Sequence, residues 1–407
     1  MSTKTIYTDD IPTDKEEILI ESQQITDFAA KIDVEVSDEA VQKGAAFAQE
    51  ITDRFVSDFE KTQEMVEKGL VDKADQMVHV STFIVKDGMI YMTYYANNQV
   101  AKEDPNQQTA RFVYCPIDDL DNKTFHDIQG FGEECYGKHV NMVYDTVMMQ
   151  KDEDTIYIMW TAHIDDRYYR LYRPFTISTK TLGEIRVNRF KVGDVVNDFS
   201  SFGIRSALTA NGIGYKKMYY DIGIMQKVTT RVENGETYYY TGTYSGDFNC
   251  IIKSKDLITW EYVAQPDFLN ESKWENATYV IGDKCYYFVR QEEVKDRRKY
   301  GFLTAYDLVN KTWDKPVLIG DCQSRSDFIV YDGQLYLFHA PRGREHIGIV
   351  KVDTDNIANS SVVLQARMHT LCFYPFIQYN EDGELSMSYT IDRKHIRLAK
   401  FTLRNYL

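Results

Sequence analysis

Residues 325–343 read RSDFIVYDGQLYLFHAPRG, and the fold can be predicted from the pattern of this stretch. Strand-forming residues lie on both sides of Asp332-Gly333, a dipeptide that readily adopts the two positive φ angles of a tight hairpin turn. The segment after the turn contains Tyr336 and Phe338, and aromatic residues suit the half-buried surface of a strand. The stretch therefore predicts two antiparallel strands joined by a two-residue turn.

Five other segments show the same order of strand, short turn and aromatic-rich strand. They span residues 79–96, 139–163, 221–245, 275–291 and 374–393. The last four units begin about fifty residues apart, and this fixed period is typical of repeated four-stranded propeller blades. The sequence thus predicts an all-β fold, a six-bladed β-propeller over residues 73–407. The longer gap between the second and third units leaves room for a seventh blade.

Three related heptapeptides support the repeat. DLDNKTF at residues 119–125 and DLVNKTW at 307–313 each close a unit, and SKDLITW at 254–260 stands in the same place in a third. An Asp side chain in such a turn accepts hydrogen bonds from backbone N–H groups, and the aromatic residue that follows fills the layer between sheets. We interpret these peptides as structural elements.

The residues that precede the repeats differ in character. Residues 1–35 are polar and mixed, with one apolar run at residues 18–20, which predicts an N-terminal arm or an edge strand. In residues 36–72, Phe47, Ile51 and Phe55 recur at four-residue spacing, which predicts a helix at about 37–68 with one apolar face. We expect this helix to pack on the outside of the propeller or against a second subunit, so a homo-oligomer remains open.

The composition excludes several classes of protein. The formal net charge of −15 opposes binding to nucleic acid, whose phosphates require clustered Lys and Arg. The six Cys residues form no CxxC pair, and no metal-ligand cluster or dinucleotide fingerprint occurs, so we expect neither a metal nor another cofactor. No apolar run approaches the length of a membrane span and residues 1–17 lack an apolar signal segment, which predicts a cytoplasmic protein that binds no membrane.

Residues 254–260 resemble the Asp-box of sialidases, in which Ser, Asp, Thr and Trp recur in this order. Glu275 and Arg290, fifteen residues apart, resemble the sialidase blade that carries a supporting glutamate and a carboxylate-binding arginine. Ser324-Arg325 falls where a further arginine of that cluster is expected, and Tyr374-Pro is similar to the start of the final blade, which provides a nucleophilic tyrosine.

This resemblance to the sialidase superfamily, over residues 79–405, implies a catalytic pair and an anion site. Tyr374 would be the nucleophile and Glu275 would accept its proton. Arg290 and Arg325 would hold an anionic group of the substrate. The simpler alternative is that Glu275 and Arg290 only pair across a blade.

The first inner strand departs from the sialidase pattern. Sialidases begin there with Arg-Ile-Pro, and this chain has Val78-His79-Val80-Ser81. The arginine that anchors the carboxylate is therefore absent, or is supplied by Arg111 or Arg205. His79 becomes a candidate for substrate binding at this place.

The second unit is similar to another group of propellers. Lys138-His139, Ala162-His163 and the Arg-rich segment 167–173 resemble the two-histidine blade of ulvan lyases and related rhamnosyl-glucuronate enzymes. In such lyases a His or Tyr removes the proton at uronate C5, while Arg and His neutralise the carboxylate, so the resemblance implies that His139 is catalytic and that His163 helps to bind the substrate. The alternative for each histidine is structural, a side chain on an inner strand that bonds to the backbone.

The inner strands of a propeller start near its axis, so residues at equivalent places in successive units converge. We therefore expect one axial cavity lined by His79, His139, Asp221, Glu275, Arg325 and Tyr374. Three functions fit such a site. They are a glycoside hydrolase acting on an oligosaccharide with an acidic or deoxy sugar, a uronate lyase acting by β-elimination, and a propeller that binds glycan without catalysis. The grouping of Tyr374, Glu275 and the arginines favours the hydrolase.

Overall fold

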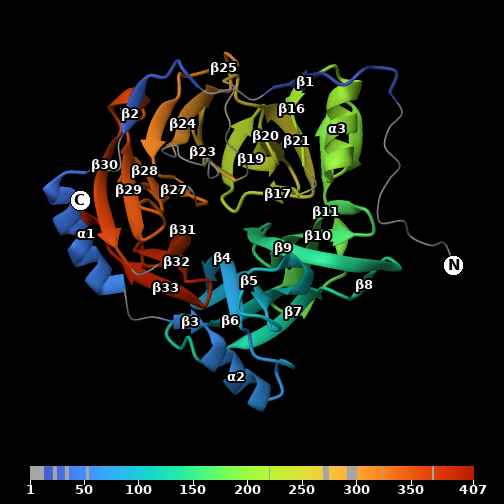
Figure 1. Cartoon of the computed structure of the whole chain (residues 1–407), viewed down its shortest axis with the longest axis vertical. Coiled ribbons are helices and arrows are strands. Elements are labelled where there is room, and N and C mark those ends of the chain that lie inside the picture. Colours follow the sequence, from blue (N-terminus) through green and yellow to red (C-terminus); the bar gives the residue numbers. More distant parts are fainter. Residues whose placement is uncertain are drawn as a thin grey trace.

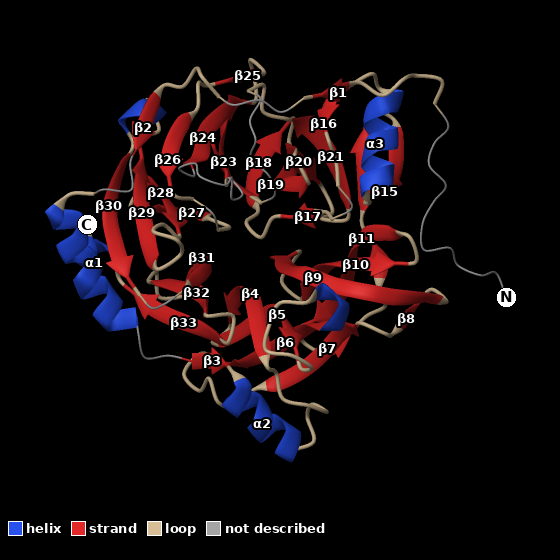
Figure 2. Cartoon of the chain, in the orientation of Figure 1, coloured by secondary structure: helices blue, strands red, loops and turns tan. Residues whose placement is uncertain are grey.

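The computed structural model describes residues 13–21, 25–32, 36–51, 55–219, 221–268, 275–290, 300–322, 324–368 and 371–407. Six sheets of four or more strands stand around a central axis (Figures 1 and 2). The chain is therefore an all-β, six-bladed propeller, and the predicted fold class is confirmed. Each predicted hairpin unit forms the inner strands of one blade.

The first three blades follow one another along the chain. Blade 1 contains β4 (Met77–Lys86), β5 (Met89–Asn97), β6 (Gln108–Pro116) and β7 (Thr124–Gly130). Blade 2 contains β8 (Glu134–Cys135), β9 (Lys138–Gln150), β10 (Thr155–Ile164), β11 (Arg167–Thr176), β12 (Thr181–Leu182) and β13 (Arg186–Val187). Blade 3 contains β14 (Arg189–Val192), β15 (Val195–Asp198), β17 (Gly223–Ile224), β18 (Thr229–Glu233), β19 (Glu236–Ser245), β20 (Phe248–Ser254) and β21 (Thr259–Ala264).

The last three blades complete the ring. Blade 4 contains β22 (Asn276–Ile281), β23 (Lys284–Val289), β24 (Tyr300–Asp307), β25 (Thr312–Trp313) and β26 (Val317–Gly320). Blade 5 contains β27 (Asp327–Tyr331), β28 (Gln334–His339), β29 (His346–Val352) and β30 (Ser361–Arg367). Blade 6 contains β31 (Cys372–Tyr379), β32 (Leu385–Ile391) and β33 (His395–Phe401), and its fourth strand comes from the N-terminal segment.

The hairpin turns have the backbone that their sequences predict. At Asp87-Gly88 the φ angles are 52° and 69°, at Asn234-Gly235 they are 52° and 81°, and at Asp332-Gly333 they are 48° and 76°. Two consecutive positive φ angles give the turn a twist that matches the twist of the paired strands. These dipeptides therefore set the register of the inner strands that reach the axis.

The heptapeptides are structural, as predicted. Oδ1 of Asp256 accepts hydrogen bonds from the backbone N–H groups of Ile258 and Thr259, both at 2.8 Å. Oδ1 of Asp307 accepts equivalent bonds from the two residues that follow Leu308. Trp260, which ends the first of these turns, is fully buried in the apolar layer between blades 2 and 3. Each turn therefore anchors the end of a strand to the packing between blades.

The N-terminal segment runs along the outer rim of blades 3 to 6 (Figure 1). β1 (Leu19–Ile20) pairs in parallel with β16 (Tyr215–Lys216), and β2 (Ala30–Ile32) pairs in parallel with β26 of blade 4. α1 (Asp38–Ile51) packs on β30 of blade 5. β3 (Phe55–Ser57) then pairs antiparallel with β33 and closes blade 6. Strands from both ends of the chain therefore share the last blade.

An N-terminal helix is present, as predicted, but one continuous helix over residues 37–68 is wrong. The structure forms α1 and a second helix, α2 (Phe59–Glu67), with β3 between them. Asp58 begins α2 by accepting a hydrogen bond from the backbone N–H of Lys61 at 2.8 Å. Pairing with β3 covers the open edge of β33, and this long-range strand pairing overrides the helical spacing of the apolar residues.

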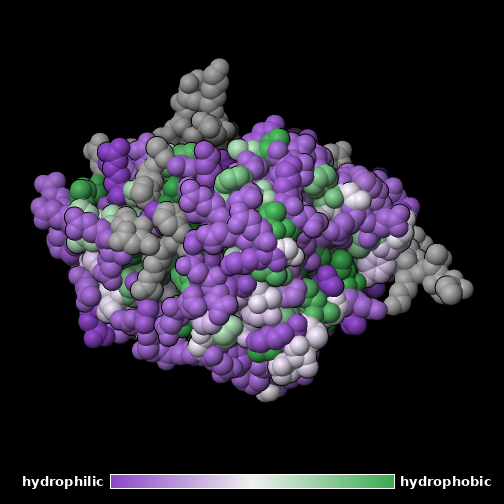
Figure 3. Space-filling model, turned by 90° about the horizontal axis from the view of Figure 1, so that it is seen from below, coloured by the Kyte–Doolittle hydropathy of each residue, from purple (hydrophilic) through white to green (hydrophobic). Residues whose placement is uncertain are grey.

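The face of the molecule that Figure 3 shows is mainly hydrophilic. In the side view of Figure 3 the apolar side chains form small scattered patches among polar ones.

α3 (Ser201–Ala210) lies between the strands of blades 2 and 3 at the rim (Figure 2). Within the described ranges, no helix is long and apolar enough to cross a membrane.

Candidate active site

A cavity of about 730 Å³ opens at the end of the axis where the inner strands begin. All six blades contribute to its wall, because the first strand of a blade starts, and the second strand ends, at this face of the propeller. The lining residues are Val80, Tyr95, Glu103, Pro105, Met142, Tyr144, Asp145, Tyr168, Tyr219, Asp221, Tyr244, Glu275, Arg290, Arg344, Tyr374 and Arg393. Arginines and carboxylates meet there with a group of tyrosines.

Three inner strands turn at the cavity through residues in the left-handed backbone region. The φ angles of Val80, Asp145 and Tyr374 are 56°, 54° and 54°. At each of these residues the pairing with the neighbouring strand is interrupted by a bulge. A bulge bends its strand and re-aims a side chain, and a positive φ at a residue other than glycine costs free energy. The conformations that present Asp145 and Tyr374 to the cavity therefore lower the stability of the fold.

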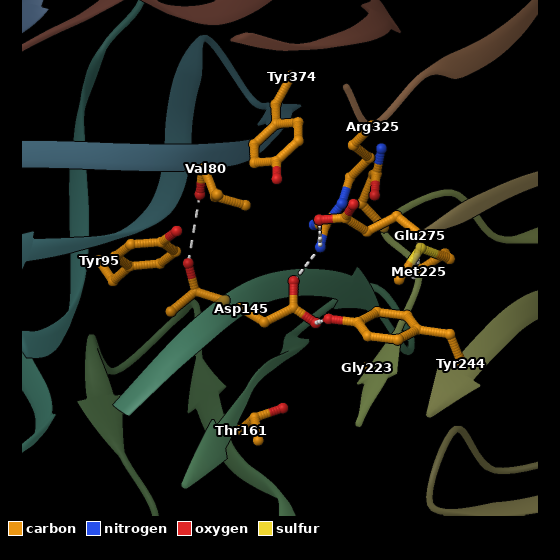
Figure 4. Close-up of polar contacts among 12 residues, drawn as sticks. Val80, Tyr95, Asp145, Thr161, Gly223, Met225, Tyr244, Glu275, Arg325 and Tyr374 are labelled. Atoms are coloured by element: carbon orange, nitrogen blue, oxygen red, sulfur yellow. Dashed lines mark hydrogen bonds and ion pairs between the residues drawn. The ribbon is translucent and has the colours of Figure 1, made fainter. Parts of the chain in front are cut away.

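A chain of buried charges forms the floor of the cavity. Nε of Arg290 lies 2.6 Å from Oε2 of Glu275, and Nη2 of Arg325 lies 3.5 Å from Oε1 of the same carboxylate. Arg325 also pairs with Asp145, whose other carboxylate oxygen lies 3.2 Å from Nη1 of Arg170. Figure 4 shows Glu275, Arg325 and Asp145 converging below Tyr374. Because opposite charges alternate, each carboxylate is held in place by arginines on two sides.

Glu275 is ionised in this setting. Burial alone would raise the pKa of the Glu275 carboxyl, but Arg290 and Arg325 outweigh burial and hold the pKa below its usual value. The nearby Tyr374 hydroxyl also helps to lower the pKa of this carboxyl. Glu275 is therefore ready to accept a proton from the phenol beside it.

Tyr374 sits at the centre of the floor. Its hydroxyl oxygen accepts a hydrogen bond from Nη1 of Arg290 at 3.3 Å. Burial, and then the charge of Glu275, raise the pKa of Tyr374 above that of a free tyrosine, so the phenol is protonated at rest. Its ring stacks on the imidazole of His79 with the ring centres 4.8 Å apart. The ring is thus fixed while the hydroxyl faces a base and a cation.

Two further arginines stand beside Tyr374. The guanidinium groups of Arg344 and Arg393 lie over the ring of Phe373, at 5.1 and 4.5 Å from its centre. Nε of Arg393 lies 2.9 Å from a carboxylate oxygen of Glu103, which also accepts a hydrogen bond from the Tyr95 hydroxyl at 2.6 Å. These arginines line the cavity together with Arg290, and two of the three are paired there, Arg290 with Glu275 and Arg393 with Glu103.

The opposite side is acidic and aromatic. Asp221 lies there with Tyr144, Tyr168 and Tyr244. Burial, with the nearby charges of Glu275 and Asp145, raises the pKa of Asp221 to about 7, against a backbone hydrogen bond that lowers it. A carboxyl with this pKa is half protonated near neutral pH and can donate a proton. The cavity therefore holds one carboxylate that accepts protons and one that donates them.

The structure brings four of the sequence candidates together. Glu275, Arg290, Asp221 and Tyr374 line the one cavity. Glu275 and Arg290 also form the ion pair that the simpler, structural alternative for these two residues predicts.

His79 and Arg325 lie beneath the cavity and do not line it. Both side chains are buried, with exposed fractions of 0% and 2%. Burial, with the charges of nearby arginines, holds the pKa of His79 well below its usual value, so the ring is neutral. His79 supports the ring of Tyr374 and Arg325 joins Asp145 to Glu275.

His139, His163 and Arg205 do not reach the cavity. His139 is exposed near the start of β9, where it pairs with Glu134, and the residues of this strand that line the cavity are Met142, Tyr144 and Asp145. The prediction that His139, at the start of its unit, lies at the axis is wrong because β9 has 13 residues and begins well away from the axis. His163 stacks behind Tyr168, with the ring centres 4.4 Å apart.

The two arginines suggested as substitutes for the first-blade arginine are also placed elsewhere. Arg205 lies on α3 and pairs with Glu17 of the N-terminal arm at 2.6 Å. Arg111 is buried in blade 1, where Nη2 lies 2.6 Å from the carboxylate of Asp75. The arginines that reach the cavity are instead Arg344 and Arg393. The sequence feature that could have identified the cavity arginines is their position. Arg290, Arg344 and Arg393 each lie within five residues after the second strand of a blade.

Comparisons with known proteins agree on the architecture. No family model matches the chain, and no curated protein matches it. Among solved structures, a Trypanosoma rangeli sialidase in complex with the inhibitor DANA is 14% identical, with a TM-score of 0.52, and the match covers 81% of this chain and 55% of that one. This chain thus spans about half the length of the Trypanosoma sialidase.

Two bacterial structures are similarly related. A mutant of the NanB sialidase from Streptococcus pneumoniae is 9% identical with a TM-score of 0.51, over 88% of this chain and 71% of that one. The intramolecular trans-sialidase from Ruminococcus gnavus is 11% identical with a TM-score of 0.51, over 81% of this chain and 95% of that one. Identities this low establish the architecture and leave the substrate open. The chain has a sialidase-like β-propeller fold.

Proposed function

We propose that the chain is a glycoside hydrolase that acts on an oligosaccharide with an acidic sugar at its end. The observation that carries the proposal is the Tyr374 hydroxyl, held between the Glu275 carboxylate and Nη1 of Arg290 on the floor of a cavity with three arginines. A phenol with a raised pKa is a poor nucleophile unless a base takes its proton, and here an ionised carboxylate is in contact with it.

In this mechanism Tyr374 attacks the anomeric carbon and forms a covalent glycosyl–enzyme bond. Its proton passes to Glu275, and the bond from the anomeric carbon to the leaving oxygen breaks. Asp221, whose pKa is about 7, supplies a proton to that oxygen. Water then releases the sugar, with Asp221 taking up a proton and Glu275 returning one to the phenol. The tyrosine replaces the carboxylate nucleophile of most retaining glycosidases.

The three arginines support an anionic substrate. Arg290, Arg344 and Arg393 come from three successive blades and face one region of the cavity beside Tyr374. An arginine–carboxylate pair gains strength from parallel hydrogen bonds when water is excluded. A carboxylate on the terminal sugar fits this cluster, and the tyrosines opposite offer rings against which sugar faces pack.

Elimination receives less support from the geometry. The lyase alternative places His139 near the substrate, and this side chain is exposed near the start of β9, outside the cavity. A propeller that binds glycan without catalysis remains an outcome of the experiment that follows.

The test compares two variants on a panel of oligosaccharides and chromogenic glycosides that carry sialic, glucuronic or other acidic sugars. We expect Tyr374→Phe to lower kcat by a factor of about 10³ or more, since it removes the nucleophile and leaves the ring packing in place. His139→Ala is the control and should keep wild-type activity. Products are followed by release of the reducing sugar and by the ultraviolet absorbance of an unsaturated uronate.

Each outcome points to one function. An active Tyr374→Phe together with an inactive His139→Ala and an absorbing product would transfer the assignment to elimination. Wild-type protein that binds members of the panel and turns over none of them would make the propeller a binding module.

A further inference from the structure

A second cavity, which we call the distal cavity, lies at the other end of the propeller axis. Its volume is about 300 Å³. Residues near the ends of the inner strands line it, among them Val85 of β4, Met149 of β9 and Tyr379 of β31. The same three strands contribute Val80, Asp145 and Tyr374 to the candidate active site. Five residues of strand span about 17 Å, so the two cavities open on opposite faces.

A buried ion pair separates the two cavities. Nζ of Lys227 lies 3.1 Å from Oδ2 of Asp327 and donates a hydrogen bond to the backbone carbonyl of Ile377. Along β31, Ile377 stands between Tyr374 of the active site and Gln378 of the distal cavity. The ion pair of Lys227 and Asp327 therefore closes the propeller axis between the two cavities. A ligand in one cavity leaves the other accessible.

The lining of the distal cavity is uncharged. Among the described residues that line it, none is Asp, Glu, Lys, Arg or His, in a protein of which 27% is charged. Ile84, Met148 and Val228 supply apolar surface, and Gln150, Gln226 and Gln378 supply amides. An amide both donates and accepts hydrogen bonds, as a sugar hydroxyl does. This lining suits a neutral polyhydroxylated ligand and disfavours an anion.

Two tyrosines of the distal cavity have fixed rings. The Tyr379 hydroxyl donates to the backbone carbonyl of Val330 at 2.6 Å, and its ring stacks on Tyr331. The Tyr239 hydroxyl donates to the carbonyl of Lys151 at 3.3 Å. Tyr379 nevertheless leaves 42% of its surface exposed. Aromatic rings that are held in place offer a flat apolar surface at small entropic cost.

One polar group of the distal cavity lacks a partner. The Gln226 side chain is only 4% exposed, and its Nε2 donates to the carbonyl of Ser326 at 3.4 Å. Its amide oxygen accepts no hydrogen bond from the part of the chain that the structure describes. A buried acceptor without a donor costs free energy, and a hydroxyl group is the kind of donor that it lacks.

We propose that the distal cavity binds one neutral sugar unit of a glycan, through the rings of Tyr239 and Tyr379 and the side-chain amides of Gln226 and Gln378. The volume is at the lower limit of small-molecule sites, which fits a single sugar ring with part of its neighbour. This second site needs no catalysis at the first, so it stands whether or not the proposed function holds. Two sites on one propeller would raise the affinity for a surface that displays many glycan chains.

The test uses the natural reporters of the two cavities. Met148 and Met149 line the distal cavity, and Met142 lines the active site. The full chain with ¹³C-methyl methionine is titrated with glucose, galactose, mannose, N-acetylglucosamine, lactose and cellobiose. We expect at least one of them to shift the Met148 or Met149 methyl signals saturably and to leave that of Met142 in place.

Two matched variants decide the location. Thr230→Trp puts a large ring at an exposed position of the distal cavity, and Thr312→Trp makes the same change at an exposed position of β25. The first should weaken binding at least tenfold, and the second should leave it unchanged. If Thr230→Trp does not fold, Tyr379→Ala replaces it with the same expectation. The proposal is overturned if no saccharide shifts Met148 or Met149, or if binding survives the deciding variant. Shifts at Met142 alone would overturn it and leave the proposed hydrolase intact.

Discussion

Three features of Tyr374 cost free energy, and its position in the cavity explains all three. Its φ of 54° lies in the region that favours glycine, its ring is buried, and its hydroxyl has a raised pKa. A residue kept in such a conformation by its surroundings is a sign of a functional site. The side chains around it support this position: His79 stacks on the ring, Arg290 donates a hydrogen bond to the hydroxyl, and the charged carboxylate of Glu275 lies close to it.

Asp221 predicts the pH dependence of activity. Its pKa of about 7 means that it can donate a proton below that pH, so kcat should fall as the pH rises through 7. Asp221→Asn should lower kcat by a factor of about 10²–10⁴ and remove this alkaline limb. The measurement is a pH–rate profile of both proteins on the same substrate. An unchanged alkaline limb in the variant would assign the acid to another group.

The same carboxyl makes a prediction for stability. The pKa of Asp221 is raised from 3.8 in the unfolded chain, so between pH 4 and 7 the folded state binds more protons than the unfolded state. The free energy of unfolding of the wild type, relative to Asp221→Asn, should therefore decrease as pH rises through this window. The slope is at most about 1.4 kcal/mol per pH unit. Urea unfolding at several pH values measures it.

Arg344 predicts how the substrate is held. Because this guanidinium lines the cavity next to Tyr374, Arg344→Ala should raise KM for an acidic substrate by a factor of about ten or more. Arg342→Ala is the control, since Arg342 is exposed two residues earlier on the same loop and does not line the cavity. Equal KM values for the two variants would contradict an anion site at Arg344.

At the scale of the elements, the N-terminal segment holds the ring of blades from outside. β3 supplies the outermost strand of blade 6, so residues from both ends of the chain share one sheet. α1 covers the outer strand of blade 5, with Phe47 and Ile51 buried against it. Covering and pairing these outer strands protects open edges that would otherwise attract other chains.

Gly44 makes the docking of α1 testable. A methyl group at this position would overlap the backbone carbonyl of Gln365 in β30, so the helix packs closely only with glycine there. Gly44→Ala normally stabilises a helix by about 1 kcal/mol, but here we expect it to destabilise the protein by about 1–3 kcal/mol. Thermal unfolding measures the change. A matched variant, Gln42→Ala on the exposed face of α1, should be neutral or slightly stabilising.

At the scale of the whole molecule, the propeller gathers residues that are far apart in sequence. Asp145, Glu275 and Tyr374 come from three blades and meet through bulged or strand-end positions around one axis. The two ends of that axis differ in charge, because arginines and carboxylates line one cavity and uncharged side chains line the other. The ion pair of Lys227 and Asp327 keeps the two environments separate.

The sequence by itself determined the repeat. Turn dipeptides such as Asp332-Gly333 and the period of the hairpins depend on local backbone preferences, so six blades could be predicted from the sequence, and the structure removed the possible seventh. The pairing of Glu275 with Arg290 and the place of Tyr374 could also be predicted. Glu275 and Arg290 flank the first hairpin of blade 4, where the register is simple, whereas Tyr374 lies at a bulge of β31 and its place followed from the resemblance to the final blade of sialidases.

Only the tertiary structure decided which polar residues face the axis. His139 starts a strand that is longer than the others, and His79 precedes a bulge that turns Val80 toward the cavity in its place. Arg344 lies on a loop of blade 5 and Arg393 lies on a loop of blade 6. The direction of both loops depends on packing against Phe373 of blade 6. Bulges, loop paths and contacts between blades result from long-range packing, which residue spacing along the chain does not encode.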